Sequence, residues 1–315
     1  MGAIASRYRV SNAGLVSTDL QNTENEKKPV NPGSLDELHK KTKDVMPVNF
    51  EGAKLMVNNG ISNHFQMTHT LTMSSQQSGY KLGATYIGTK QISPTEAFPV
   101  ILGDVNPAGN VNFNLIHQLT PEIRVKGAAQ IQECKLTATQ GTVEYKGSDY
   151  TLSMAVGKPD FSENSAVFVG HYLQSVSRRA ALGAELVYQA GTRVPGGEVA
   201  IASAAARYTM DDSEVSATLG AAGLNLCYFK KASEQLQIVA EMETSFQGME
   251  SVGTIGYQVT IPKAELVFRG MVDSNWNIGA VLEKKLQPLP CTFALSGMAN
   301  QAKQQFKFGC GLIIE

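Results

Sequence analysis

The chain has 315 residues, a formal net charge of −1 and 17% charged residues. A soluble domain usually carries about a quarter of charged residues, yet no run of about 18 apolar, uncharged residues offers a membrane-spanning helix. Spanning helices are therefore excluded, and the near-neutral charge gives no whole-molecule reason to expect a nucleic-acid partner.

The first predicted element is a polar arm. Residues 1–33 include a hydrophilic stretch from Gln21 to Lys28 followed by Pro29 and Pro32, and this composition predicts a flexible N-terminal arm. The opening Met-Gly-Ala-Ile-Ala-Ser fits the N-myristoylation pattern with Gly2 as the acceptor. The alternative is an unmodified start that happens to be rich in small residues.

A short helix is expected over residues 34–47. Ser34 and Glu37 have the spacing of a capping box, in which each side chain binds a main-chain amide near the other residue, and Pro47 ends the segment. Its apolar face is thin and lies beside several lysines, so this helix must pack against something larger. The apolar positions are Leu35, Leu38, Val45 and Met46.

Residues 49–315 alternate polar and apolar side chains, which is the pattern of half-buried strands. The cleanest example is 110–115, where three asparagines alternate with Val111, Phe113 and Leu115. A tilted strand crosses a bilayer in about 9–11 residues, so this length allows about 19 strands in one transmembrane β-barrel. The alternative, a stack of soluble β-sandwiches, would need apolar faces that meet in pairs and more breaks between domains.

Several motifs resemble the channel-forming subunits of the translocase of the outer mitochondrial membrane (TOM), which belong to the mitochondrial porin superfamily. The similarity covers about residues 31–315, and its motifs occur in the family's order. They are residues 88–99 (GTKQISPTEAFP), 62–66 (SNHFQ), 171–175 (HYLQS), 273–276 (DSNW) and 282–286 (LEKKL).

This resemblance implies a nineteen-stranded barrel in the outer mitochondrial membrane, with the N-terminal helix inside the pore. It also implies a protein-conducting channel that imports preproteins. The partners it implies are presequence receptors, small single-helix subunits, a second copy of the chain and membrane lipids.

The C-terminus matches the family's membrane-insertion signal at Lys307, Gly309, Leu312 and Ile314. In the same segment, alternate residues from Phe306 onward form one apolar face, as a closing strand requires. A half-buried strand without any signalling role is the alternative.

Because apolar strand positions would face lipid, the positions between them should face the pore. The strand registers place a set of carboxylates inside, and the basic candidates are Arg124, Lys126 and Arg269. An acidic surplus would attract cationic, amphipathic presequences into a confined aqueous path. The predicted acidic contacts are Glu144, Glu185, Glu241, Glu243, Glu265, Asp273 and Glu283.

His69 falls on the apolar face of its strand, where an imidazole is costly unless it has a partner or lies at headgroup level. A headgroup-level position and a contact with another subunit are both open.

No catalytic constellation is present in the sequence, and the four cysteines form no CxxC pair, so neither an enzyme, a metal site nor a cofactor is expected. The main competing function is a metabolite or anion porin of the same barrel class, which predicts a basic lumen. A soluble all-β binding protein is the third class.

Overall fold

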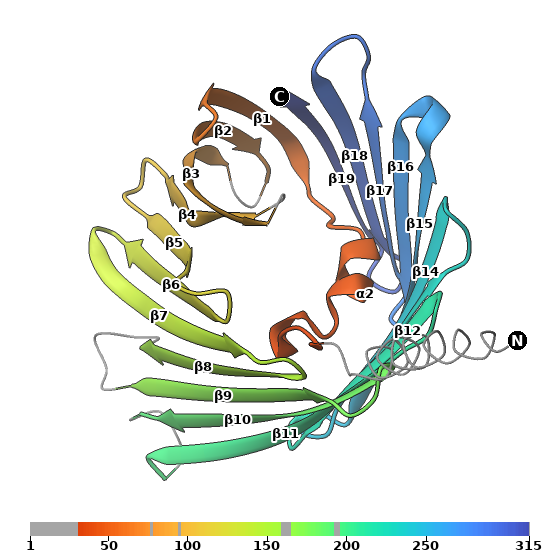
Figure 1. The fold of residues 1–315 in the computed structure, drawn as a ribbon. Coiled ribbons are helices and arrows are strands. Elements are labelled where there is room, and N and C mark those ends of the chain that lie inside the picture. The colour runs from red at the N-terminus through yellow and green to blue at the C-terminus, as the bar shows by residue number, and fades with distance from the viewer. Residues whose placement is uncertain (1–30, 76–77, 94–95, 159–164, 192–195, 315) are drawn as a thin grey trace, which may run out of the picture.

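The two-sided strands of this chain bury neither face against a second sheet, and instead they close into a ring (Figure 1). The computed structural model describes residues 31–75, 78–93, 96–158, 165–191 and 196–314. Within these residues the strands form one 19-stranded sheet, which confirms the predicted transmembrane β-barrel class.

The strands follow the chain around the ring, and most are 8 to 12 residues long. They are β1 (Gly52–Ser62), β2 (Phe65–Met73), β3 (Gly79–Ser93), β4 (Glu96–Val105), β5 (Val111–Gln118), β6 (Ile123–Gln132), β7 (Lys135–Lys146), β8 (Tyr150–Lys158), β9 (Ala166–Ser175), β10 (Ala180–Ala190), β11 (Glu198–Thr209), β12 (Ser213–Gly220), β13 (Gly223–Lys231), β14 (Leu236–Ser245), β15 (Glu250–Ile261), β16 (Leu266–Asp273), β17 (Asn277–Lys285), β18 (Cys291–Asn300) and β19 (Gln305–Ile314).

The ring closes between its first and last strands. β1 pairs with β19 in parallel, from Gly52 opposite Gly309 to Val57 opposite Ile314. The other neighbours pair antiparallel, as between β1 and β2 and between β18 and β19. An odd number of strands in an up-and-down ring requires one parallel pair, so this seam follows from the strand number.

The outer surface is apolar, as the alternating pattern predicts. Leu182 and Leu186 are 54% and 55% exposed, and Phe306 and Phe308 at the closing strand are 73% and 55% exposed. Such a surface is unfavourable in water and suits a bilayer, where every strand is hydrogen-bonded to two neighbours. Among the described residues, no helix is long and apolar enough to cross a membrane.

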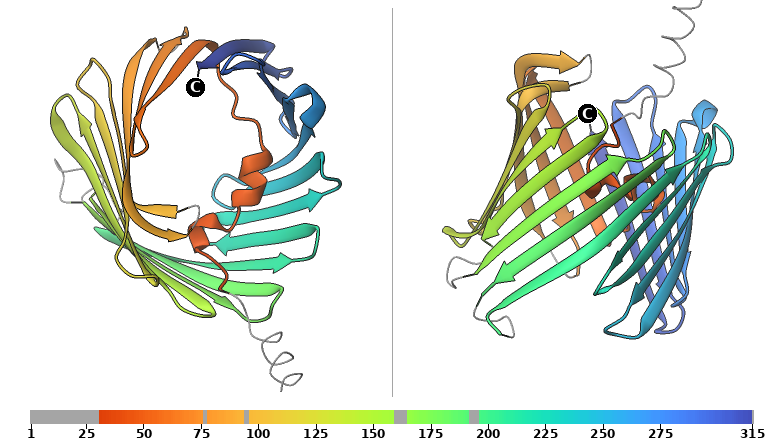
Figure 2. Two further views of the ribbon diagram at one scale, coloured as in Figure 1. Left: turned by 45° about the horizontal axis from the view of Figure 1, so that its top comes forward. Right: turned by 60° about the horizontal axis from the view of Figure 1, so that its bottom comes forward.

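The predicted helix over 34–47 lies inside the ring, but as two shorter pieces (Figures 1 and 2). These are a 3-10 turn η1 (Leu35–Glu37) and an α-helix α2 (Lys40–Val45). The predicted capping box is wrong, since the Ser34 side chain makes no capping hydrogen bond and only its carbonyl accepts from Glu37 N, at 3.2 Å. Burial against the wall decides the shape of the segment, because Leu38 and Val45 are each only 2% exposed.

The wall beneath this segment provides the barrel's buried apolar cluster. Leu38 packs with Leu173, Ala181 and Ala205 from β9, β10 and β11. At the other end, a Cβ on Gly256 of β15 would lie 2.7 Å from the Met46 sulfur and 2.9 Å from Val239 Cγ2, so any larger residue would require these side chains to shift. Small wall residues therefore make room for residues 31–48, which we call the lumen segment.

The predicted arm lies mostly outside the described residues, and so does Gly2. Its last part, residues 31–33, is held by the wall. The Asn31 amide donates to the carbonyls of Gly147 at 2.7 Å and Tyr150 at 3.1 Å, and the Arg207 guanidinium donates to the Pro32 carbonyl. Residues 31–33, which the sequence assigns to the arm, are therefore bound to the barrel wall.

Candidate functional site

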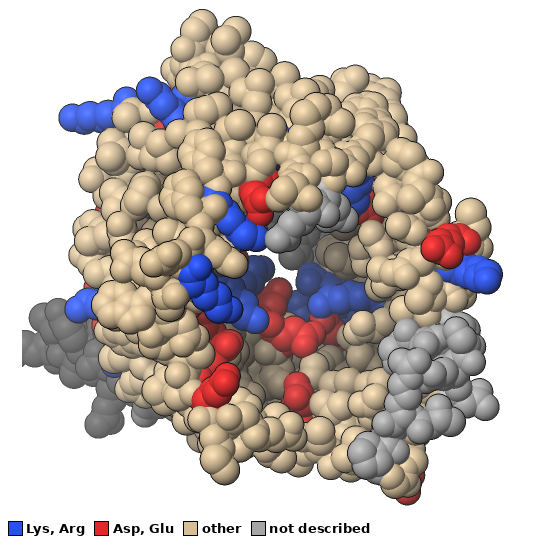
Figure 3. All heavy atoms as spheres, turned by 180° about the vertical axis from the view of Figure 1, so that it is seen from behind, with Lys and Arg blue, Asp and Glu red and all other residues tan. Residues whose placement is uncertain are grey.

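The inner face of the ring carries charged side chains of both signs around a central opening (Figure 3). Most are joined in ion pairs between neighbouring strands or between the wall and the lumen segment. The pairs are Lys81–Asp104, Lys126–Glu144, Arg269–Glu283 at 2.9 Å, Lys41–Glu214 at 2.5 Å and Lys307–Glu51 at 3.1 Å.

Three of the predicted acidic contacts are taken up by partners within the chain. The Glu144 side chain is 1% exposed and is bound by Lys126, while Glu283 is bound by Arg269. Glu185 lies 2.9 Å from Nε2 of His171, whose Nδ1 is 3.3 Å from Asp36 of η1. The charges of Glu144 and Glu283 are therefore compensated within the wall, and Glu185 is linked through His171 to Asp36 of the lumen segment.

Three other predicted contacts form what we call the acidic patch: Glu241, Glu243 and Asp273. Glu241 and Asp273 lie opposite Thr254 on its two sides, so the patch spans β14 to β16. A single amide, Asn225 Nδ2, donates to Glu241 at 3.3 Å and to Glu243 at 3.4 Å. Among the described residues, no ion pair of the barrel includes any of these three carboxylates.

Glu265 requires a correction to its predicted place on a lumen-facing strand. It follows the 3-10 turn η2 (Pro262–Ala264) in the left-handed conformation, with φ of 50°, and β16 begins only at Leu266. Its carboxylate accepts a hydrogen bond from the Gln287 amide. Pro262 stops the strand before Glu265, so the alternation of β16 does not reach this residue.

The predicted basic candidates were too few. Lys54, Lys81, Arg207 and Lys307 also lie on the inner face, where Lys81 and Lys307 bind carboxylates and Arg207 binds the lumen segment. The described wall is therefore mixed in sign, with a local acidic patch in place of a general acidic surplus. Applying the same alternation to residues 52–62 and 79–93 would have found Lys54 and Lys81.

His39 connects the lumen segment to β12. Its ring nitrogens lie 2.8 Å from the Ser216 hydroxyl and 2.9 Å from the Thr218 hydroxyl. The pKa of His39 is lowered from 6.5, chiefly because burial disfavours the charged ring and further because Lys43 is near, with a partial offset by Glu241. The neutral ring is therefore the form that docks.

This pKa shift gives the docking of α2 a pH dependence. A histidine whose pKa is lower in the docked than in the free segment stabilises docking fully above 6.5, and that stabilisation is lost as pH falls below 6.5. We expect a nitroxide placed at the exposed position Asp44 by Asp44→Cys, with the native cysteines replaced, to become more mobile between about pH 7 and pH 5.

The matched control for this pH effect is His39→Gln, which keeps a hydrogen-bonding side chain without a titrating ring. Its mobility curve should be flat in the same range, and His171, which lies beside Asp36 and Glu185, is common to both proteins. An equal slope in both proteins would contradict the assignment to His39.

The outer-face histidine has a partner that the sequence did not reveal. His69 Nδ1 lies 2.6 Å from the Tyr80 hydroxyl on the neighbouring strand. The contact satisfies one ring nitrogen within the barrel. Neither of the two predicted explanations, a headgroup-level position or a subunit contact, is needed to give that nitrogen a hydrogen bond.

The C-terminal residues of the predicted insertion signal all lie at the seam. Lys307 binds Glu51, whose pKa is lowered first by the Ser75 hydroxyl and then by Lys307. Leu312 and Ile314 pair with β1, and a Cβ on Gly309 would come within 2.4 Å of the Phe50 carbonyl oxygen. These positions therefore have a structural use in closing the ring.

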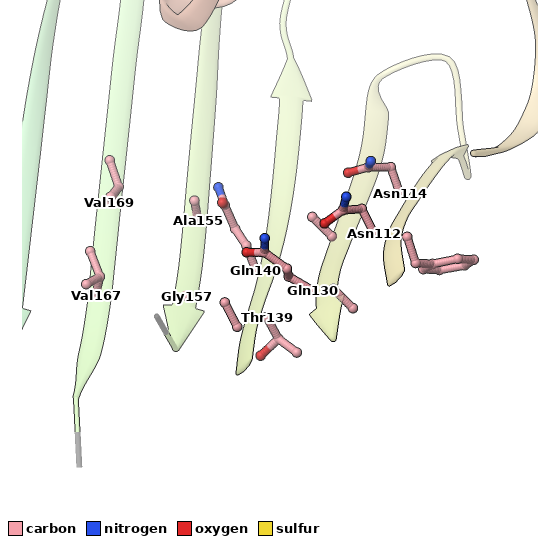
Figure 4. A pocket seen from close by; sticks show the side chains of 13 residues that line it. Asn112, Asn114, Gln130, Thr139, Gln140, Ala155, Gly157, Val167 and Val169 are labelled. Carbon is pink, nitrogen blue, oxygen red and sulfur yellow. The ribbon is translucent and has the colours of Figure 1, made fainter. Parts of the chain in front are cut away.

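A neutral recess of about 520 Å³ lies on the inner face of β5 to β9. Figure 4 shows the amides of Asn112, Asn114, Gln130 and Gln140 grouped there, with Val167 and Val169 further along. This part of the wall offers hydrogen bonds without charge. In the described part of the chain, no cluster of three His, Cys, Asp or Glu residues is arranged to hold a metal ion.

Comparison with known proteins identifies the family to which this barrel is similar. Residues 31–309 match the model of the eukaryotic porin family. The chain is 55% identical to mitochondrial import receptor subunit TOM40 homolog 2 of Drosophila melanogaster, over 91% of this chain and 86% of that protein. It is 48% identical to the mitochondrial import receptor subunit TOM40 homolog of Bos taurus, over 90% and 78%, and 45% identical to that of Caenorhabditis elegans, over 90% and 94%.

Proposed function

Because the chain belongs to the eukaryotic porin family, among the TOM40 homologues, we propose that it is a protein-conducting channel importing mitochondrial preproteins across the outer membrane. It is a β-barrel of the mitochondrial outer membrane. The family consists of channels, in agreement with the expectation that the chain is not an enzyme. The relatives' names describe import receptor subunits, which supports assembly into a TOM complex.

The finer proposal is that the acidic patch attracts the cationic presequence of a passenger. The observation that carries it is the set of three carboxylates, Glu241, Glu243 and Asp273, which no described cation neutralises. A narrow aqueous path with low-dielectric walls strengthens their field. Each interaction must stay weak, since a deep electrostatic well would trap the passenger.

Neutralising the acidic patch tests this role. We expect the combined changes Glu241→Gln, Glu243→Gln and Asp273→Asn to weaken block of the reconstituted channel by a synthetic cationic amphipathic presequence. Each ion pair contributes about 1 kcal/mol in a high dielectric, so the blocking affinity should fall about 10- to 100-fold. Single-channel recording at fixed ionic strength measures it.

The matched control removes the same number of negative charges outside the lumen, by Asp211→Asn, Asp212→Asn and Glu234→Gln in exposed turns. It should leave the block unchanged. Equal block of the patch variant and the unmodified channel would refute the role of the acidic patch.

An anion porin remains the competing function and predicts a basic lumen. The mixed wall and the unneutralised acidic patch do not favour it, and neither do the names of the relatives. Reversal potentials in the same recordings separate the two functions, because the anion porin requires anion selectivity.

The remaining assignments are proposals supported by position. We propose that Lys307, Gly309, Leu312 and Ile314 serve as the membrane-insertion signal, since they lie on the last strand of the barrel. Contacts with presequence receptors, small single-helix subunits and a second copy would use the outer apolar face, where His69 lies. Acylation of Gly2 concerns residues outside the described part.

A further inference from the structure

We propose that the wall beneath α2 is a binding site for cationic amphipathic segments, occupied in this structure by the chain's own residues 35–46. An incoming presequence would compete with this segment for the same surface. The inference rests on the proposed import function and adds to it the place where the presequence binds and the segment that it displaces.

The charge of α2 matches the class of passenger. Its six residues contain three lysines and one aspartate. Lys41 binds Glu214 at 2.5 Å, and the Glu214 side chain is 7% exposed while Lys41 is 54% exposed. A lysine that reaches from open water to a recessed carboxylate makes a contact that another cation can replace.

The site of α2 is continuous with the acidic patch. Ser216, which binds His39, lies opposite Cys227, and Cys227 lies opposite Glu241. Lys43 of α2 and Glu241 both act electrostatically on His39, so both lie near it. A presequence drawn to the acidic patch therefore arrives beside α2.

The apolar contacts of the segment complete the match. Leu38, between η1 and α2, and Thr42 and Val45 of α2 are each 2% exposed, so the segment is buried on the side that meets the wall. At the wall, Leu38 packs against Leu173, Ala181 and Ala205, while α2 lies against β13, β14 and β15. The surface thus recognises an apolar stripe beside lysines, which is the same pair of properties that defines an amphipathic presequence.

The segment depends on the wall for its helical form. Helices shorter than about 12–15 residues are marginal in water, and α2 has six. Once displaced, residues 40–45 would lose their helix, so docking and folding of the segment are one event. Such a segment acts as an internal competitor, which a ligand with higher affinity for the wall displaces.

A reducible crosslink tests the competition in a single protein. The helix α2 lies against β13, and the side chains of Thr42 and Cys227 interact there. We therefore expect Thr42→Cys to form a disulfide with Cys227 on oxidation, which an intact mass confirms before block is recorded. Exposed Cys134 is replaced by serine to prevent intermolecular bonds. We expect oxidation to weaken block by a cationic amphipathic peptide about 10-fold or more, because the site stays filled, and reduction to restore it.

Two controls define the outcome. Cys227→Ser in the same background cannot crosslink, and its block should not respond to oxidation. Separately, Lys41→Met removes the Glu214 ion pair of the segment, and block of this variant should tighten severalfold relative to the unmodified channel.

The proposal is overturned if oxidised and reduced proteins are blocked equally, since α2 would then be a permanent part of the wall. In that case the proposed function stands, because the peptide still blocks. Absence of block in both forms, and in the unmodified channel, would instead remove the proposed function together with this inference.

Discussion

Replacing Lys126 by methionine is expected to destabilise the barrel by about 3 kcal/mol, the lower end of the range for breaking a buried ion pair. Lys126 binds Glu144, whose side chain is 1% exposed. Without the ammonium group, a carboxylate remains buried with reduced compensation. Arg124 lies opposite Glu144 on the neighbouring strand, so the loss should not reach the upper end of the range.

The measurement is urea-induced unfolding in detergent micelles, followed by far-ultraviolet circular dichroism. Glu144→Gln should cost less than Lys126→Met, because the Lys126 side chain is 33% exposed and can turn toward water. The double variant should recover part of the loss, since neither charge is then left alone. Additive losses in this double-mutant cycle would show that the pair does not couple.

The sequence predicts the fold well because its strongest signal, alternation, is also the constraint that a bilayer imposes. The segment 110–115 illustrates this: Phe113 is exposed on the outer surface while Asn112 and Asn114 line the recess inside. The number of strands followed from length, and the parallel closure followed from the odd number. The alternation depends on local sequence alone, and the number of strands and the parallel closure follow from the length of the chain.

The lumen was harder to predict, because its properties depend on which residues meet across the ring. Ser34 does not cap the helix as predicted, because the segment packs against the wall as two short pieces. Glu265 left its strand because the turn after Pro262 holds it in a left-handed conformation. The alternation of polar and apolar residues predicts neither the loss of the Ser34 cap nor the position of Glu265.

Charge pairing explains why the structure has a local acidic patch where the sequence predicted an acidic surplus over the whole lumen. Of the carboxylates placed inside, Glu144 and Glu283 face cations that lie on neighbouring strands at separations of 18 and 14 residues. A count along the sequence cannot show which charges neutralise one another. Glu241 and Glu243 differ because their closest described partner is the neutral amide of Asn225.

The lumen segment lies inside the ring (Figure 2), so undocking it should have a large effect on conductance. We expect the double change Leu38→Asp and Val45→Asp to raise single-channel conductance, because residues 35–46 would leave the inner wall. Burial of two such side chains contributes about 3–6 kcal/mol, and each is 2% exposed here. The docked population should therefore fall by roughly two to four orders of magnitude.

Recordings in planar bilayers would measure the conductance, and the control is Val48→Asp on the same segment, where the side chain is 82% exposed. That change should leave conductance at the unmodified level, because it removes no buried contact. If the double variant folds, inserts and conducts like the unmodified channel, the polar contacts of His39 and Lys41 must hold the segment without its apolar face. If conductance rises, block by a cationic amphipathic peptide should tighten in parallel, since the vacated wall no longer has an internal competitor.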